Sequence, residues 1–156
     1  MPGHTDHVSS IAILNDGTIV SSSKDRSLKF WNPETLECRQ TLPLFNRNLN
    51  ALAPMPGGLL AVAVENIIKV YNLQQGDFEK SIAGHSKNIL TMLTLPDGSI
   101  LSGGQDTVIK YWNTKNGTLI KNFYGHKDFV KSIIQINVSG ILKFRTISLL
   151  HQEKIK

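Results

Sequence analysis

The sequence predicts an all-β fold built from a repeated unit of about 41 residues. Gly-His pairs occur at residues 3–4, 84–85 and 125–126, so the last two pairs are separated by one period and the first two by two periods. An aromatic residue followed by Asn occurs at residues 31–32, 71–72 and 112–113. Helical periodicity of apolar residues is nowhere sustained, which favours strands as the elements of the core.

Two more landmarks keep the same period. An acidic residue stands six positions before each aromatic residue of the Asn pairs, and a glycine stands eight positions before each acidic residue. The acidic residues are Asp25, Glu65 and Asp106, and the glycines are Gly17, Gly57 and Gly98. Four landmarks with one spacing identify the unit as a structural repeat.

The first unit shows which strands each repeat contains. Residues 8–14 are predicted as a strand that ends in the turn at Asn15, Asp16 and Gly17, where glycine can adopt a positive φ. Residues 18–23 and 27–31 form the next two strands around a turn at residues 24–26, and residues 36–42 form the fourth. Four short strands in this length correspond to one blade of a β-propeller.

Length and composition limit the class of protein. The chain has 156 residues, 40% of them hydrophobic and 19% charged, which indicates one ordinary folded domain. No apolar run is long enough to cross a bilayer, and the N-terminus lacks the pattern of a secretory signal. The single Cys38 supplies neither an internal disulfide nor a zinc-binding set. A cytoplasmic protein is expected, with a nuclear location left open, and no cofactor or metal is expected.

The net charge of +5 is unevenly distributed. Residues 1–142 have a balance of +2, whereas residues 143–156 alone contribute +3. The body of the chain therefore lacks the basic stripe that nucleic-acid binders present, and nucleic acid is a disfavoured partner. The basic residues 143–156 leave one alternative function open, that of a phosphate or nucleic-acid binder that acts through this tail.

These landmarks resemble the WD-repeat family of β-propellers. The pattern of Gly-His, Asp-Gly, Ser-x-x-x-Asp and a strand that ends in Trp and a polar residue is clearest in residues 3–32 and 84–113, which align without a gap. Trp-Asn stands here where the family often has Trp-Asp. The resemblance covers about 140 residues and implies a partial WD-repeat propeller with blades of four antiparallel strands.

Ser, His, Asp and Trp recur together in two units, and two interpretations are open. A hydrolase would use one Ser-His-Asp set for catalysis, which needs an exposed nucleophile and an oxyanion hole. The resemblance instead implies a structural tetrad, a chain of hydrogen bonds that holds the blade together, and duplication of the set favours this second interpretation. The tetrad positions are His4, Ser21, Asp25 and Trp31 in the first unit, and His85, Ser102, Asp106 and Trp112 in the third.

Two units depart from the pattern. In the second, Leu44 and Phe45 replace Gly-His, Ala61 replaces the Ser, Glu65 the Asp and Tyr71 the Trp, so apolar packing is expected to hold this blade. In the fourth, Lys143 stands at the Ser position, and no Trp follows. The predicted organisation is a propeller segment over residues 1–142, with units 3–43, 44–83, 84–124 and an incomplete 125–142, followed by a basic tail over residues 143–156. A truncated form of a longer WD-repeat protein is the expectation.

The expected function is a non-catalytic scaffold or adaptor for other proteins or peptides, since the resemblance implies this. Self-association that closes the propeller is a further expectation, and no membrane contact is expected. The resemblance places partner contacts three and five residues after each tetrad His and one before each tetrad Asp. These candidates are His7, Ser9, Lys24, Asn88, Leu90, Gln105, Phe129 and Lys131, with Asn48, Asn50 and Val64 assigned less securely in the second unit.

Overall fold

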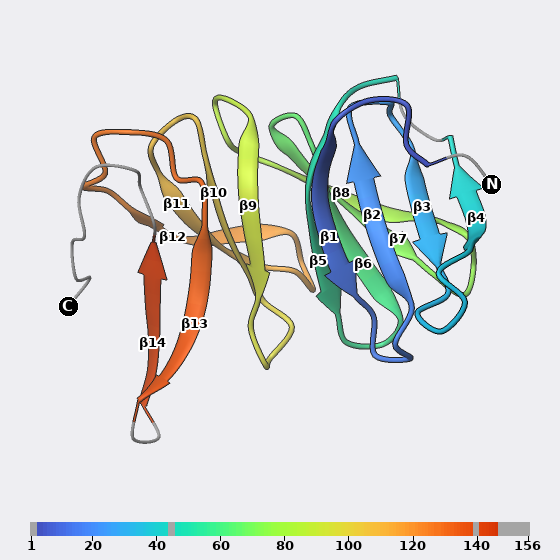
Figure 1. The fold of residues 1–156 in the computed structure, drawn as a ribbon. Coiled ribbons are helices and arrows are strands. Elements are labelled where there is room, and N and C mark those ends of the chain that lie inside the picture. Colours follow the sequence, from blue (N-terminus) through green and yellow to red (C-terminus); the bar gives the residue numbers. More distant parts are fainter. Residues whose placement is uncertain (1–2, 44–45, 139–140, 147–156) are drawn as a thin grey trace.

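The computed structural model describes residues 3–43, 46–138 and 141–146, and all of its regular elements are strands (Figure 1). Three antiparallel sheets of four strands follow one another along the chain, and a two-stranded hairpin follows them. We call the sheets blade 1 (β1–β4), blade 2 (β5–β8) and blade 3 (β9–β12), and the hairpin blade 4 (β13–β14). Each full sheet has the strand order of the chain, so the described blades form a part of a β-propeller.

The strand bounds agree with the repeat that the sequence predicts. Blade 1 contains β1 Val8–Ile13, β2 Ile19–Ser23, β3 Leu28–Trp31 and β4 Cys38–Leu42. Blade 2 contains β5 Leu49–Met55, β6 Leu59–Val64, β7 Ile67–Asn72 and β8 Asp77–Ala83. Blade 3 contains β9 Ile89–Thr94, β10 Ile100–Gly104, β11 Ile109–Asn113 and β12 Thr118–Phe123. Blade 4 contains β13 Ile133–Val138 and β14 Ile141–Thr146.

The first turn of each full blade uses its glycine as expected. Gly17 has φ 84° and its N–H donates to the carbonyl of Leu14 over 2.9 Å. Gly98 has φ 83° and makes the same 2.9 Å bond to Leu95. A residue with a Cβ is strained at such φ values, which explains why glycine recurs at this point of the period.

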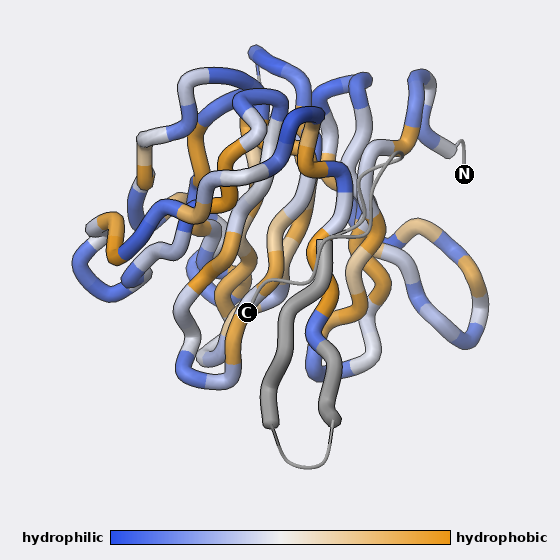
Figure 2. The backbone as a smooth tube through the Cα atoms, turned by 90° about the vertical axis from the view of Figure 1, so that its left-hand side faces the viewer, coloured by the Kyte–Doolittle hydropathy of each residue, from blue (hydrophilic) through white to orange (hydrophobic). Residues whose placement is uncertain are grey.

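Neighbouring blades pack face to face through apolar side chains. The loops at the ends of the strands are largely hydrophilic (Figure 2). The interface between blades 1 and 2 includes Val20, Leu28, Phe30, Leu52, Leu60, Val62 and Tyr71. The interface between blades 2 and 3 includes Ala53, Ala61, Ile68, Val70, Met92, Ile100 and Trp112. A smaller cluster joins blade 3 to blade 4 through Leu101, Ile109, Val130 and Ile133. As the sequence predicts, blade 2 relies on apolar packing on both of its faces.

The register of blade 2 differs from the expected one. In blades 1 and 3 the tetrad serine pairs with a lysine of the next strand, Ser21 with Lys29 and Ser102 with Lys110. The equivalent lysine of blade 2 is Lys69, and it pairs with Val62. The interpretation of Ala61 as the replacement for Ser is therefore wrong by one residue. Ala61 faces blade 3 instead, because β6 and β7 are joined by a two-residue turn and pair from Val64 and Ile67 onward.

Blade 4 also differs in its extent. Strand β14 runs from Ile141 to Thr146 and pairs with β13, so the predicted boundary after Leu142 falls inside a strand. Residues 147–156, which make up most of the expected basic tail, lie outside the described residues. Within the described residues, no helix is long and apolar enough to span a membrane.

Candidate functional site

The four tetrad residues of blade 3 form a continuous chain of hydrogen bonds. His85 Nδ1 lies 2.9 Å from Asp106 Oδ2, and His85 Nε2 lies 2.7 Å from Ser102 Oγ. The indole Nε1 of Trp112 donates to the same Ser102 Oγ over 2.7 Å. His85 comes from the loop before β9, Ser102 from β10 and Trp112 from β11, so these bonds tie one loop to two strands. His85, Ser102 and Trp112 are all buried.

Blade 1 repeats this arrangement. His4 Nδ1 lies 2.8 Å from Asp25 Oδ2, and His4 Nε2 lies 2.7 Å from Ser21 Oγ. Trp31 Nε1 donates to Ser21 Oγ over 2.8 Å. The two sets differ in cover, because Trp112 packs against blade 2 whereas Trp31 is partly exposed on the outer side of blade 1. We call the side of a blade that bears these Ser and Trp positions its tetrad face.

One assignment of protons satisfies every bond of the blade 3 chain. The Trp112 N–H donates to Ser102 Oγ, the Ser102 hydroxyl donates to Nε2 of a neutral His85, and the Nδ1–H of His85 donates to Asp106. Burial lowers the pKa of His85, and the Asp106 carboxylate opposes this effect without reversing it. The low pKa keeps the imidazole neutral near pH 7, as the assignment requires.

The carboxylates of both sets are held in their charged form. Burial raises the pKa of Asp106, but the hydrogen bonds from His85 and from the backbone N–H groups of Ser86 and Val108 outweigh it and lower the pKa below its ordinary value. Burial acts in the same direction on Asp25, whose pKa is nevertheless held well below its ordinary value by Ser27, His4 and the N–H of Thr5. Each aspartate thereby fixes the backbone that follows its histidine.

Sequence reasoning did not identify Ser27 as a member of the blade 1 network. Its hydroxyl donates to Asp25 Oδ1 over 2.7 Å and lies 3.3 Å from His4 Nδ1. The signal was available, since a serine two residues after an aspartate often bonds back to its carboxylate in a turn. Blade 3 has Val108 at the matching position, and its second side-chain donor to the aspartate is instead the Ser86 hydroxyl, 3.4 Å from Asp106 Oδ2.

The Ser-His-Asp sets lack the exposed nucleophile that acyl transfer needs. Ser102 is fully buried, Ser21 is nearly so, and each hydroxyl is already engaged by a histidine and a tryptophan. Among the described residues, no group of three or more His, Cys, Asp or Glu side chains is placed to hold a metal ion. The chemistry that the arrangement supports is hydrogen bonding between strands and loops.

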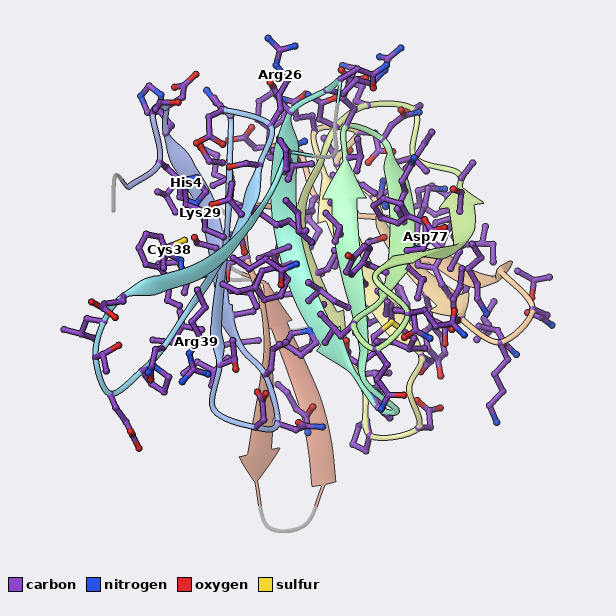
Figure 3. All side chains as sticks on the ribbon, turned by 90° about the vertical axis from the view of Figure 1, so that its right-hand side faces the viewer. His4, Arg26, Lys29, Cys38, Arg39 and Asp77 are labelled. Carbon is purple, nitrogen blue, oxygen red and sulfur yellow. The ribbon has the colours of Figure 1, made fainter. Side chains whose placement is uncertain are left out.

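The predicted partner-contact residues of blades 1 and 3 lie at one end of the strands, on what we call the Gly-His loop face. This face comprises the loops at residues 3–7, 84–88 and 125–129 and the turns at residues 24–26 and 105–107. The Lys24 N–H donates to the carbonyl of His7 over 2.9 Å, and the Gln105 N–H makes the same bond to Asn88. Arg26 projects beyond the end of the sheet at this face (Figure 3). Loop and turn are thus joined within each blade.

The predicted contact residues differ in exposure. His7, Ser9, Lys24 and Lys131 are exposed, and Asn88, Leu90 and Gln105 are half-buried. Phe129 is 38% exposed beside the fully buried Val130. This exposure argues against a Phe129 side chain packed entirely inside blade 4.

Blade 2 presents a different surface at the same end. Asn48 is exposed and Asn50 is half-buried, but Val64 is buried against blade 1 and offers no contact surface, contrary to expectation. The one-residue shift of β6 turns Val64 toward the core. Glu65 forms an ion pair with Arg47 on the surface and has no tetrad to join.

Comparison of the sequence with known proteins agrees with the fold described above. The family model described as "WD domain, G-beta repeat" matches residues 1–32 and 76–113. These segments contain both tetrads, and the core of blade 2 lies between them. The chain is 28% identical over 103 residues to Autophagy-related protein 16 of Arabidopsis thaliana. The matched region covers 64% of this chain and 20% of that protein. It is 27% identical over 95 residues to WD repeat-containing protein 3 of Mus musculus. This matched region covers 61% of this chain and 10% of that protein.

Solved structures share the fold. The WD40 β-propeller domain of Doa1 superposes with a TM-score of 0.79 at 20% identity, covering 92% of this chain and 48% of that one. The WD40 repeats of RRP9 superpose with a TM-score of 0.73 at 20% identity, covering 83% of this chain and 42% of that one. The chain spans less than half of either solved structure and a fifth or less of the curated relatives. The repeat landmarks, the family match at two repeats and the superposed blades together support the WD-repeat family and show the fold of a partial WD40 β-propeller.

Proposed function

We propose that this chain is a non-catalytic scaffold that binds other proteins or peptides through the Gly-His loop face. WD-repeat proteins typically act as platforms for protein interaction, which supports the general class. The fold alone does not identify a partner, because unrelated functions share it. The choice of face therefore rests on the geometry of the loops.

The observation that carries the proposal is the double attachment of the Gly-His loops of blades 1 and 3. In blade 3 the Asp106 carboxylate accepts from the Ser86 N–H over 3.1 Å, while the Gln105 N–H donates to the Asn88 carbonyl over 2.9 Å. The loop is held at both of its ends by the turn at residues 105–107. A loop fixed in this way presents variable side chains with little loss of conformational entropy on binding.

The proposed surface has the composition of a small binding site. Phe129 and the half-buried Leu90 supply apolar area, and His7, Lys24, Asn88 and Gln105 supply polar groups around it. Apolar anchors within a polar rim are the common arrangement in protein interfaces. The absence of a catalytic role is supported by the buried state of Ser21 and Ser102 and by the presence of two such sets in one chain.

Site-specific photo-crosslinking tests the proposal. A benzophenone amino acid is placed in turn at His7, Asn88 and Phe129, and at Asn15 and Asn116 in turns at the opposite ends of strands. The proposal predicts that crosslinks to a given partner form at the first three positions and not at the last two. For that partner, Phe129→Ala and Leu90→Ala should each weaken binding by about 1 kcal/mol or more with the fold retained. Crosslinks confined to Asn15 and Asn116 would refute it.

Self-association is a second candidate, which one specific observation favours. In blade 1, Ile11 pairs with the tetrad residue Ser21. Met92 has the equivalent position in blade 3, opposite Ser102, and it packs into the interface with blade 2. Ile11 and Ile13 are exposed on the tetrad face of blade 1, where no described residue covers them. Sedimentation velocity tests this candidate: Ile11→Glu should reduce any oligomer to monomer, and an oligomer that survives the substitution would exclude this face.

A further inference from the structure

The outer strands of the three full blades are edge strands. Within the described residues, β4 pairs only with β3, β8 only with β7 and β12 only with β11 (Figure 1). An edge strand offers unpaired N–H and C=O groups to any extended segment that can approach it. Proteins commonly block such edges with charged side chains, so the side chains at these edges decide which of them is open.

The three edges share a bulge but differ at the bulged residue. In β4 the pairing skips Arg39, in β8 it skips Glu79 and in β12 it skips Ile120. A charged residue therefore occupies this position in blades 1 and 2, and an apolar one occupies it in blade 3. Ile120 is 50% exposed, and its neighbour Leu119 is 41% exposed.

The apolar character of this edge continues beyond the strand. Tyr124, the residue after β12, is 76% exposed. By contrast, the exposed residues of β4 and β8 are polar or charged apart from Ala83: Arg39, Gln40 and Thr41 in β4, and Asp77, Glu79 and Ser81 in β8. The edge of blade 3 alone combines unpaired backbone groups with exposed Leu, Ile and Tyr side chains among the described outer strands.

Between Asp106 and Asp128, the charged residues on either side of β12 in the sequence have one sign. Residues 107–127 contain four lysines and no aspartate or glutamate. Lys110 donates to Asn122 Oδ1, and the ammonium of Lys121 lies 5.2 Å from the centre of the Phe123 ring. Lys121 and Lys127 are exposed on either side of Tyr124 in the sequence. A second copy of this chain would bring like charges together, whereas an acidic segment would meet complementary ones.

We propose that β12 is a docking edge for an extended acidic segment of a partner protein, which adds to blade 3 as a fifth strand. Its backbone pairs with β12, its apolar side chains contact Leu119, Ile120 and Tyr124, and its carboxylates face Lys121 and Lys127. Strand addition of this kind derives affinity from main-chain hydrogen bonds and specificity from alternate side chains. Apart from Lys127, which belongs to the loop at residues 125–129, the residues of this edge lie outside the Gly-His loop face, so either site can fail without the other.

The test uses the full chain and a fluorescein-labelled peptide, as long as β12, in which Glu alternates with Val. Fluorescence anisotropy should show binding that is about tenfold tighter than that of the matching Lys-Val peptide. Ile120→Glu introduces the residue type that blade 2 has at its bulge and should weaken binding about tenfold. The matched control, Arg39→Glu in blade 1, should leave the affinity within about twofold.

Two further measurements identify the mode of binding. Two peptides are N-methylated at alternate residues, one at the odd and one at the even positions. Only one of the two should lose binding, because only every second N–H group of the added strand pairs with β12. Hydrogen exchange should show protection of residues 118–124 and none of residues 38–42. Equal affinity of the acidic and basic peptides, equal effects of the two methylation patterns, or protection outside β12 would overturn the proposal. Dimerisation of the chain that Ile120→Glu abolishes would also overturn it, since β12 would then bind a second copy.

Discussion

The backbone of Gly84 passes directly beneath the indole ring of Trp112. A methyl group on the Cα of Gly84 would lie 2.3 Å from Cη2 of that ring, closer than side-chain carbons approach one another. At Gly125, the next Gly of a Gly-His pair, the same methyl group would meet nothing within 4 Å. Gly84 thus makes room for the tryptophan of its own unit, whereas a methyl group on Gly3, whose unit also has a tryptophan, would meet nothing within 4 Å.

Gly84→Ala and Gly125→Ala separate this packing effect from backbone strain. Both residues have a positive φ, 157° and 137°, so an alanine carries conformational strain at either position. Only Gly84→Ala also displaces a buried ring, and it should cost about 1–3 kcal/mol more than Gly125→Ala in urea unfolding. Equal losses at the two positions would show that the ring does not depend on the glycine.

Trp112→Ala should lower the free energy of unfolding by about 3–5 kcal/mol, as the loss of other buried aromatic rings does. Trp31→Ala should cost clearly less, because Trp31 is partly exposed. Asp106→Ala should fall between Trp112→Ala and a surface substitution, because it leaves the Nδ1–H of His85 and the N–H of Ser86 without their acceptor. Chemical denaturation of the three variants checks this order, and a loss below about 1 kcal/mol for Trp112→Ala would contradict the assigned register.

Stability should decrease as the pH falls below about 6.5, the ordinary pKa of histidine in an unfolded chain. Because the pKa of His85 is lowered in the folded state, the unfolded chain binds the proton first, and acid favours unfolding. One extra proton corresponds to a slope of at most about 1.4 kcal/mol per pH unit. A further loss is expected below about pH 4, as Asp25 and Asp106, whose pKa values are also lowered, become protonated.

Urea unfolding between pH 7 and pH 5 measures this first decrease. His85→Gln should flatten it, and His7→Gln, a substitution of an exposed histidine, should leave it unchanged. A flat profile in the unmodified chain would contradict a neutral, buried His85.

Leu36→Gly should raise the stability of the chain by about 1 kcal/mol. Leu36 has φ 58° and is 73% exposed, and its N–H donates to the Asn32 carbonyl over 2.9 Å. Blades 2 and 3 make the same turn with Gly76 and Gly117 bonded to Asn72 and Asn113. The substitution removes strain and little buried area, whereas Gly117→Leu should destabilise. Thermal unfolding of both variants decides, and a Leu36→Gly chain that melts lower would contradict the prediction.

The repeat landmarks predicted the strands closely, because turn residues and the period fix where each strand can begin. The first predicted strand, residues 8–14, corresponds to β1 Val8–Ile13, and the other three of blade 1 agree to within two residues at either end. Strand limits depend on local turn chemistry, which is visible in sequence. The resemblance to WD-repeat propellers located the side chains that meet in the tetrads, and both sets keep identical spacing.

The register of blade 2 was not predictable in this way. Counting from Glu65 placed Ala61 at the Ser position, but the two-residue turn at residues 65–66 lengthens the hairpin pairing and places Val62 there. A hairpin with a given number of residues can have a longer turn and shorter paired strands, or a shorter turn and longer paired strands. The burial of Val64 follows from this shift. The bulge at Ile120 was also outside the reach of the repeat, because it depends on how β12 pairs with β11.

The most direct test of the central claim is the unfolding free energy of the Ser102→Ala chain. If the Ser-His-Asp-Trp set holds the blade and its loop in place, removal of the hydroxyl leaves His85 Nε2 and the Trp112 N–H buried without partners. The account predicts a loss of about 1–3 kcal/mol in equilibrium urea unfolding. A catalytic serine is commonly replaced without loss of stability, so an unchanged or increased unfolding free energy would contradict the account.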